Sequence, residues 1–340
     1  MAQTLFGFYV SFSGESSAPI NNVYALSPTG GAPVCTAVLG TNPSGAFQEL
    51  RGMAFGPDGN FYVAQAFKGA SAILQFNGTL SSGSCTMTFL TEFVTPASSP
   101  GLVHPYQPIF GPDGNLYVSS QDSNIVSAFY GPSNAGKAMP AWSLLPGTFY
   151  PGTFVPAFSA KVGIPPNTSV PVNQGGLTFV TTSSSTHSVR GLAFDTAGNL
   201  YVADEGNNRV SVFSSAGTFL GAITQSKNHT ISQPVALCFD TASAILYIAS
   251  PGNQSLFAYN VSGVAKKNFD ANFLVSDSNL DKLSGIALDL SGNIYTATRK
   301  ENEIAKWTAS GSSWSSSPFA GPFSDSPEQI IPVYTPLSGA

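Results

Sequence analysis

The chain has 340 residues, a length that suits one closed array of repeats. Only 9% of the residues are charged, the net charge is −5, and no basic tract is present, so nucleic acid is not expected as a partner. No apolar run approaches the ~20 residues that span a membrane, so no membrane partner is expected either.

The first predicted elements are two strands near the N-terminus. The stretch Leu5–Phe12 is apolar but short, and no Lys or Arg precedes it, which favours a strand over a signal peptide. The segments FGFYVSF and NNVYALSP match the second and third strands of a repeat that recurs later in the chain. A first strand for this unit is missing from the N-terminal region.

The repeat itself is the strongest pattern in the sequence. Each copy combines an apolar strand, a tight turn rich in Asp, Gly and Asn, and a strand with alternating Tyr or Leu. A third strand and a less regular fourth strand follow, and four strands per ~45 residues are typical of a propeller blade. The copies begin at Leu50, Pro105, Val189, Pro234 and Leu283.

The C-terminus supplies the missing first strand. PEQIIPV, from Pro327, matches the first-strand pattern, and we expect it to pair with the N-terminal strands and close the ring. The sequence thus predicts an all-β, six-bladed propeller formed by a single domain over residues 1–340. Seven blades are the alternative, because 84 residues separate Pro105 from Val189.

The long gap is predicted to be an insertion between blades three and four. Residues 131–186 are rich in Pro and aromatic residues and lack the turn motif of the repeat. Pro at this density does not suit central strands. We therefore expect the outer strand of blade three and a long loop that covers the mouth of the central channel.

Cysteines and glycosylation sequons give weak information on the compartment. Cys35 and Cys85 fall at similar positions of adjacent blades, expected to lie too far apart for a disulfide, and Cys238 lies in an apolar strand. Asn-x-Ser/Thr sequons favour a secreted glycoprotein, although chance alone would produce about as many. They begin at Asn77, Asn167, Asn228, Asn253 and Asn260.

The repeat resembles the NHL repeat. Its best copy is VRGLAFDTAGNLYVADEGNNRVSVFSSAG, at 189–217, and the resemblance covers nearly the whole chain outside the insertion. This resemblance specifies the fold well but the function poorly, because propellers carry out many different activities. More distantly, the chain is similar to gluconolactonase/regucalcin-like propellers and to the amidating lyases.

Both of these enzyme groups use the second position of the first strand for metal ligands. The resemblance transfers that position to a ring of six residues in this chain: Arg51, Tyr106, Arg190, Val235, Ser284 and Glu328. This ring has no His and one carboxylate, which departs from both families and argues against a divalent metal. No cofactor is therefore expected, with a divalent metal as the alternative.

The ring can also be interpreted as a binding site for an anion. Arg51 and Arg190, with Ser284, would bind a planar anionic group such as a carboxylate. Tyr106, Glu328 and His104, which lies two residues before Tyr106, are the candidate acid/base residues. The simpler interpretation is that the arginines extend into solvent.

The histidines offer a second possible metal site. His104, His187 and His229 each precede a first strand and should share one face, but their registers differ. A shared metal site is the less favoured interpretation, and surface loop histidines the more favoured one. Asp204 and Glu205 could suggest calcium, but an acidic residue here is expected to cap its own loop.

The sequence therefore predicts an extracellular, monomeric propeller that binds a small or oligosaccharide-like, anionic ligand at the channel mouth. It could be a metal-free lyase or hydrolase that acts on a uronate or a lactone. A metal-dependent lactonase-like hydrolase and a non-catalytic binding or scaffold protein are the alternatives.

Overall fold

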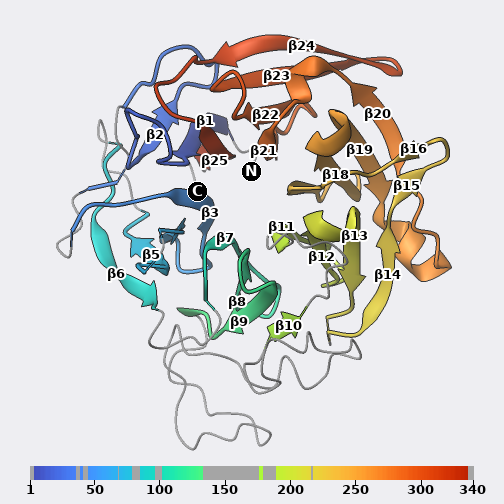
Figure 1. Cartoon of the computed structure of the whole chain (residues 1–340), viewed down its shortest axis with the longest axis horizontal. Coiled ribbons are helices and arrows are strands. Elements are labelled where there is room, and N and C mark those ends of the chain that lie inside the picture. Colours follow the sequence, from blue (N-terminus) through green and yellow to red (C-terminus); the bar gives the residue numbers. More distant parts are fainter. Residues whose placement is uncertain are drawn as a thin grey trace, which may run out of the picture.

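The structure is a computed structural model. It describes residues 4–35, 39–40, 45–67, 69–78, 85–95, 102–132, 189–215 and 217–335, together with the backbone of 176–178. Within these residues, the sheets are arranged as six blades around a central axis (Figure 1). No helix of the described residues is long and apolar enough to cross a membrane.

Blades one to three contain the N-terminal half of the chain and its last strand. Their strands, from the axis outward, are β25 (Pro327–Thr335), β1 (Thr4–Phe12) and β2 (Val23–Leu26) in blade one; β3 (Leu50–Phe55), β4 (Phe61–Gln65), β5 (Ala72–Phe76) and β6 (Phe89–Val94) in blade two; and β7 (Pro105–Phe110), β8 (Leu116–Ser120), β9 (Ile125–Phe129) and β10 (Gly176–Thr178) in blade three.

Blades four to six follow the repeat more regularly. Their strands are β11 (Val189–Phe194), β12 (Leu200–Asp204), β13 (Arg209–Phe213) and β14 (Phe219–Ile223); β17 (Ala236–Asp240), β18 (Ile245–Ser250), β19 (Ser255–Asn260) and β20 (Asn272–Ser276); and β21 (Leu283–Leu288), β22 (Ile294–Thr298), β23 (Glu303–Ser310) and β24 (Ser313–Ala320). A hairpin of β15 (Gln225–Ser226) and β16 (His229–Thr230) lies between blades four and five, and short 3₁₀ helices are η4 (Glu205–Asn207), η5 (Pro251–Asn253), η6 (Val261–Lys266) and η7 (Ser278–Leu280).

Ring closure by the C-terminus is confirmed. β25 pairs antiparallel with β1, with Ile331 opposite Tyr9, and it is the innermost strand of blade one. Each innermost strand contacts the innermost strands of both neighbouring blades. Glycines permit this close approach, because a Cβ at Gly191 would lie 2.8 Å from the Val235 carbonyl oxygen and one at Gly285 would lie 2.8 Å from that of Glu328.

The turn motif of the repeat stabilises the hairpin between the first and second strands. In blade four, Asp195 accepts hydrogen bonds from the backbone and side chain of Asn199 and from the hydroxyl of Tyr201, at 2.8 to 3.0 Å. The same Asp–Asn–Tyr network recurs in three other blades, at Asp58, Asp113 and Asp289. The motif is therefore a structural signature of the blade.

The hydrophobic core lies between neighbouring blades. One cluster joins Tyr9 of blade one to Phe61 of blade two, and another joins Phe8 of blade one to Tyr295 of blade six. Similar clusters fill the other blade interfaces. Because each interface is buried on both sides, the strands need apolar side chains on both faces, as the sequence shows.

The expectation that no disulfide forms was wrong. Cys35 and Cys85 are bonded, with their Cα atoms 6.1 Å apart. Cys35 forms an isolated β-bridge with Ala25 at the outer edge of blade one, and Leu39 forms one with Met87 of the next blade. Cys35 and Leu39 therefore lie against the outer edges of two adjacent blades.

The insertion is described only in part. β10 pairs with β9 as the outer strand of blade three, as expected. Most of residues 131–186 lies outside the described residues, and so do the predicted cover over the channel mouth and His187.

Candidate functional site

A cavity of approximately 490 Å³ opens at the mouth of the central channel. Its wall is formed by the starts of innermost strands and by the loops next to them. The lining residues are Glu15, Arg190, Glu205, Gln233, Val235, Pro251, Asp281, Lys282, Leu283, Arg299 and Ser326. The cavity is within the volume range of small-molecule sites.

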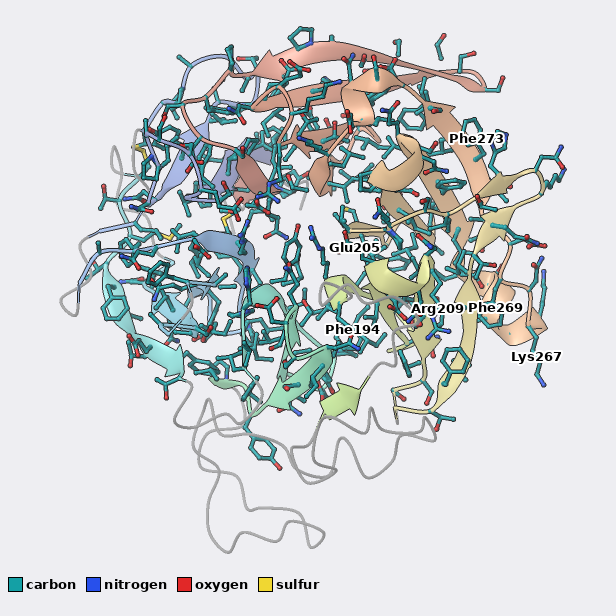
Figure 2. All side chains as sticks on the ribbon, viewed as in Figure 1. Phe194, Glu205, Arg209, Lys267, Phe269 and Phe273 are labelled. Carbon is teal, nitrogen blue, oxygen red and sulfur yellow. A yellow bond between two sulfur atoms is a disulfide. The ribbon has the colours of Figure 1, made fainter. Side chains whose placement is uncertain are left out.

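Two kinds of loop bring side chains to this cavity. The loops after the second strands carry Glu15 in blade one, Glu205 in blade four and Arg299 in blade six. The connections between blades carry Gln233 and Lys282. Both kinds of loop share one face of the propeller, and Figure 2 shows Glu205 close to its centre.

Of the six ring positions predicted from the repeat, Arg190 and Val235 line this cavity, and most of the six lie at β-bulges. The register between the first and second strands breaks at five of the six, whereas Val235 comes just before β17, which pairs with β18 without a break. A bulge redirects a side chain out of the regular pleat. The five bulged residues are Arg51, Tyr106, Arg190, Ser284 and Glu328.

Five of the six ring residues are buried, and the four polar ones form one layer. Arg51, Tyr106, Ser284 and Glu328 are at most 4% exposed. The Tyr106 hydroxyl donates to the carbonyl oxygen of Ser284 at 3.1 Å, and the Ser284 hydroxyl donates to the carbonyl oxygen of Pro327 at 2.6 Å. Both hydroxyls are thus bound to main-chain carbonyls.

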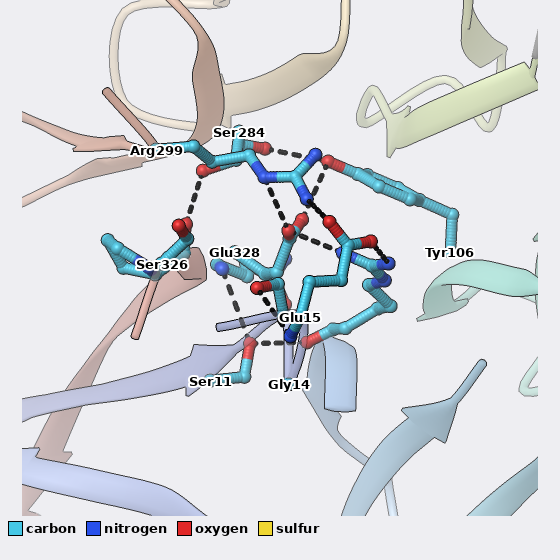
Figure 3. Close-up of polar contacts among 12 residues, drawn as sticks. Ser11, Gly14, Glu15, Tyr106, Ser284, Arg299, Ser326 and Glu328 are labelled. Carbon is cyan, nitrogen blue, oxygen red and sulfur yellow. Dashed lines mark hydrogen bonds and ion pairs between the residues drawn. The ribbon is translucent and has the colours of Figure 1, made fainter. Parts of the chain in front are cut away.

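Two carboxylates hold two guanidinium groups together at the edge of this layer (Figure 3). Glu328 accepts from Arg51 Nη1 and lies 3.0 Å from Arg299 Nε. Glu15 accepts from Arg51 Nη2 at 2.9 Å and from Arg299 Nη2 at 2.6 Å. The side chain of Glu328 is 1% exposed and that of Glu15 is 53% exposed, so one carboxylate is internal and the other faces the cavity.

Arg190 is paired separately. Its Nε lies 2.8 Å from Oε2 of Glu205, at an angle that does not make a hydrogen bond, and its guanidinium carbon lies 5.3 Å from the centre of the Tyr106 ring. The sequence predicted that Arg51 and Arg190 would bind one anion together. Here they contact different carboxylates, and Arg51 shares both of its carboxylates with Arg299.

Burial and charge shift the pKa values of these groups. Burial opposes the charge of Arg51, but Glu328 and Glu15 outweigh it and raise the pKa of Arg51. Burial raises the pKa of Glu15, but Arg299 and Arg51 outweigh it, so this pKa lies below its usual value. Burial, with a contribution from Glu328, raises the pKa of Tyr106 to about 12, which keeps the phenol protonated.

His104 lies beside this cluster, just before β7. Its Nδ1 is 3.3 Å from Oδ2 of Asp122, and its Nε2 is buried without a hydrogen-bond partner in the structure as described. Burial and then Arg51 lower its pKa, partly opposed by Asp122 and Glu49, so the ring is neutral at pH 7. His104 is not among the cavity-lining residues.

The described residues do not fit a divalent metal at the ring. Glu328, the one carboxylate of the ring, has its Oε1 in contact with two guanidinium groups. The guanidinium groups of Arg51, Arg190 and Arg299 lie at or next to the other ring positions, and their positive charge would repel a metal ion. No group of three or more His, Cys, Asp or Glu side chains in the described part of the chain could hold a metal ion.

The three histidines are not all described. His229 lies on β16, stacked on Phe273 with ring centres 3.9 Å apart, and Figure 2 shows Phe273 at the outer edge, whereas His104 precedes the innermost strand β7. His187 lies outside the described residues. Asp204 binds Asn207 and Arg209 within its own loop, as the capping interpretation expected.

The sequence interpretation missed Glu15 and Arg299. Both follow the second strand of their blade, as Glu205 does in blade four. Aligning the repeats would have revealed charged residues at one position in blades four and six, where Glu205 and Arg299 each lie four residues after the tyrosine of the second strand, whereas Glu15 lies two residues farther along its loop. Loop length varies between blades, so the alignment there is weaker than in the strands.

Comparison with known proteins agrees with this architecture. The NHL repeat model matches residues 186–213. The chain is a six-bladed β-propeller with an NHL repeat. A sequence search of curated proteins finds no match.

Solved structures of similar fold have diverse functions. The periplasmic gluconolactonase of Pseudomonas aeruginosa is 14% identical, with a TM-score of 0.57 over 98% of this propeller and 100% of that chain. A virginiamycin B lyase from Staphylococcus aureus is 12% identical, with a TM-score of 0.51 over 82% and 73%. A chain of a nidogen/laminin complex is 13% identical, with a TM-score of 0.56 over 96% and 97%. At these identities the likeness concerns the fold alone.

Proposed function

We propose that this propeller binds a small polar ligand with an anionic group, such as a sugar acid, in the cavity at the channel mouth. The observation that carries the proposal is that Arg190, Lys282 and Arg299 line one cavity. The carboxylates Glu15, Glu205 and Asp281 line it too, so the same wall offers acceptors for ligand hydroxyls. A ligand that has hydroxyl groups and one negative charge can pair with the carboxylates through its hydroxyl groups and with the cations through its charge.

Lys282 provides the cleanest test of this proposal. It is exposed, so its replacement should not disturb the core. We expect D-glucuronate to bind more tightly than D-glucose, and Lys282→Gln to weaken glucuronate binding about threefold to fivefold, the size of one exposed charge interaction. Isothermal titration calorimetry at low and high salt measures both effects, and salt should weaken the binding of glucuronate alone.

Lys267→Gln is the matched control. Lys267 is also exposed, and its φ of 52° is close to the 51° of Lys282, so both substitutions meet the same backbone. It lies at the outer edge of the propeller (Figure 2). Equal affinity for glucuronate and glucose, or equal losses in the two variants, would contradict the proposal.

A second candidate function is catalysis by His104. The observation that favours it is the His104–Asp122 pair, in which Asp122 contacts Nδ1 and leaves Nε2 as the acceptor. A neutral imidazole can remove a proton from a water that attacks a lactone, or from the carbon next to a uronate carboxylate, provided that the reacting group reaches Nε2, which is buried outside the cavity lining. The likeness to a gluconolactonase and a virginiamycin B lyase supports including lactones in the test.

The catalytic candidate predicts turnover that depends on His104. We expect His104→Gln to lower kcat/KM at least 100-fold on the substrate turned over from a panel of lactones and uronates. The rate should fall as the pH drops through the lowered pKa of His104, because protonation removes the base. His229→Gln, at an exposed histidine on β16, is the control, and turnover that is unchanged in His104→Gln would remove the catalytic candidate.

A further inference from the structure

We infer that the Arg51–Arg299 pair is a carboxylate-binding subsite that Glu15 occupies from within the chain. A ligand carboxylate would take the position of the Glu15 side chain. This inference rests on the proposed binding function and narrows its ligand class to monocarboxylates.

The geometry of Glu15 is that of a bound ligand carboxylate. Its two oxygens accept from two different guanidinium groups, Oε1 from Arg51 and Oε2 from Arg299, at 2.9 and 2.6 Å. Figure 3 shows the carboxylates of Glu15 and Glu328 beside each other, each joined by a dashed line to the guanidinium group of Arg299. Charge-assisted hydrogen bonds from guanidinium groups to a carboxylate are equally available whether the carboxylate belongs to the protein or to a ligand.

The two carboxylates differ in how firmly they are held. Glu328 belongs to β25, the strand that closes the ring, and is 1% exposed. Glu15 belongs to the loop between β1 and β2, lines the cavity and is 53% exposed. Exposed ion pairs contribute little to stability. Glu15 is therefore the carboxylate that can leave.

The backbone around Glu15 stays in place when its side chain moves. Buried Asp325 accepts hydrogen bonds from the backbone nitrogens of Gly14 and Ile20, each at 2.9 Å. The Ser13 hydroxyl, which also contacts Asp325, accepts from the Glu15 nitrogen at 3.3 Å. These bonds fix the loop on either side of Glu15, while none of them holds its side chain.

Charge balance explains why Glu15 must leave. Two arginines and two carboxylates give the cluster no net charge, so a ligand anion gains little from Arg51 and Arg299 while Glu15 is in place, and its affinity then depends on the other cations of the cavity such as Lys282. Without Glu15, the arginines exceed Glu328 by one positive charge, which matches one carboxylate. Glu15 thus acts as a tethered competitor that weakens the binding of monocarboxylates and discriminates against weak ligands.

The test compares D-glucuronate binding to the full chain and to its Glu15→Ala variant by calorimetry, with D-glucose as the uncharged probe. We expect Glu15→Ala to bind glucuronate about twofold to fivefold more tightly, the size of a lost exposed ion pair, and glucose as before. Glu301→Ala is the control, because Glu301 is also 53% exposed but does not line the cavity. Glu15→Gln repeats the test if the alanine variant does not fold.

The outcomes separate this inference from the proposed function. If the full chain binds glucuronate and Glu15→Ala binds it equally or more weakly, Glu15 is not a competitor and the inference fails, while the proposed function stands. A gain that persists in Glu15→Ala/Arg299→Gln would place the anion elsewhere and would also overturn it. If neither the full chain nor Glu15→Ala binds glucuronate at tens of millimolar, both the inference and the proposed function fail.

Discussion

A chain that ends at Asp325 should not form a stable propeller. The truncation removes β25, the innermost strand of blade one, and with it the contacts that close the ring. It also removes buried Ile330 and leaves buried Arg51 without Glu328. We expect these losses together to exceed the ~5–15 kcal/mol that stabilises a typical domain. Thermal unfolding followed by circular dichroism should show no cooperative transition.

A chain that ends at Thr335 is the control for this experiment. It keeps all of β25 and its pairing with β1. We expect it to unfold cooperatively at the temperature of the full chain. If the chain that ends at Asp325 unfolds at that same temperature, the ring does not depend on closure by the C-terminus.

Replacing Glu328 by Gln should cost about 3–5 kcal/mol of unfolding free energy, the usual cost of breaking a buried ion pair. Gln has nearly the same size as Glu but no charge. Arg51 is 4% exposed and would lose one of its two carboxylates, and Arg299 would lose a contact as well. Denaturation in urea measures the change, provided that the slope of the transition is unchanged.

Glu15→Gln is the matched comparison. It removes the other carboxylate from the same two arginines, but at a position that is 53% exposed. Water can then solvate the arginines, so the loss should be at most about 1 kcal/mol. Equal losses in Glu328→Gln and Glu15→Gln would show that burial does not set the strength of this cluster.

The blades and their closure were determined by the sequence. Alternating apolar residues and the Asp–Asn–Tyr turn are local signals, and each turn forms hydrogen bonds within about six residues, as in Asp195–Tyr201. The first-strand pattern at Pro327 was sufficient to predict pairing with the N-terminus, because a propeller without that strand leaves a sheet edge open. The ring of six residues at the second position of each first strand was predicted from the same alignment of the repeats.

The pairing of charges at the channel mouth was decided only by the tertiary structure. The sequence placed Arg51 and Arg190 at equivalent positions, but bulges and loops of different length determine which carboxylate each guanidinium reaches. Glu15 and Arg299 come from loops that are far apart in sequence, and they meet because ring closure joins blade six to blade one. The Cys35–Cys85 bond has the same origin, since a connection between blades brings together edges that a regular repeat would separate. A periodic pattern fixes the strands of each blade, whereas contacts across blades depend on loops that the period does not describe.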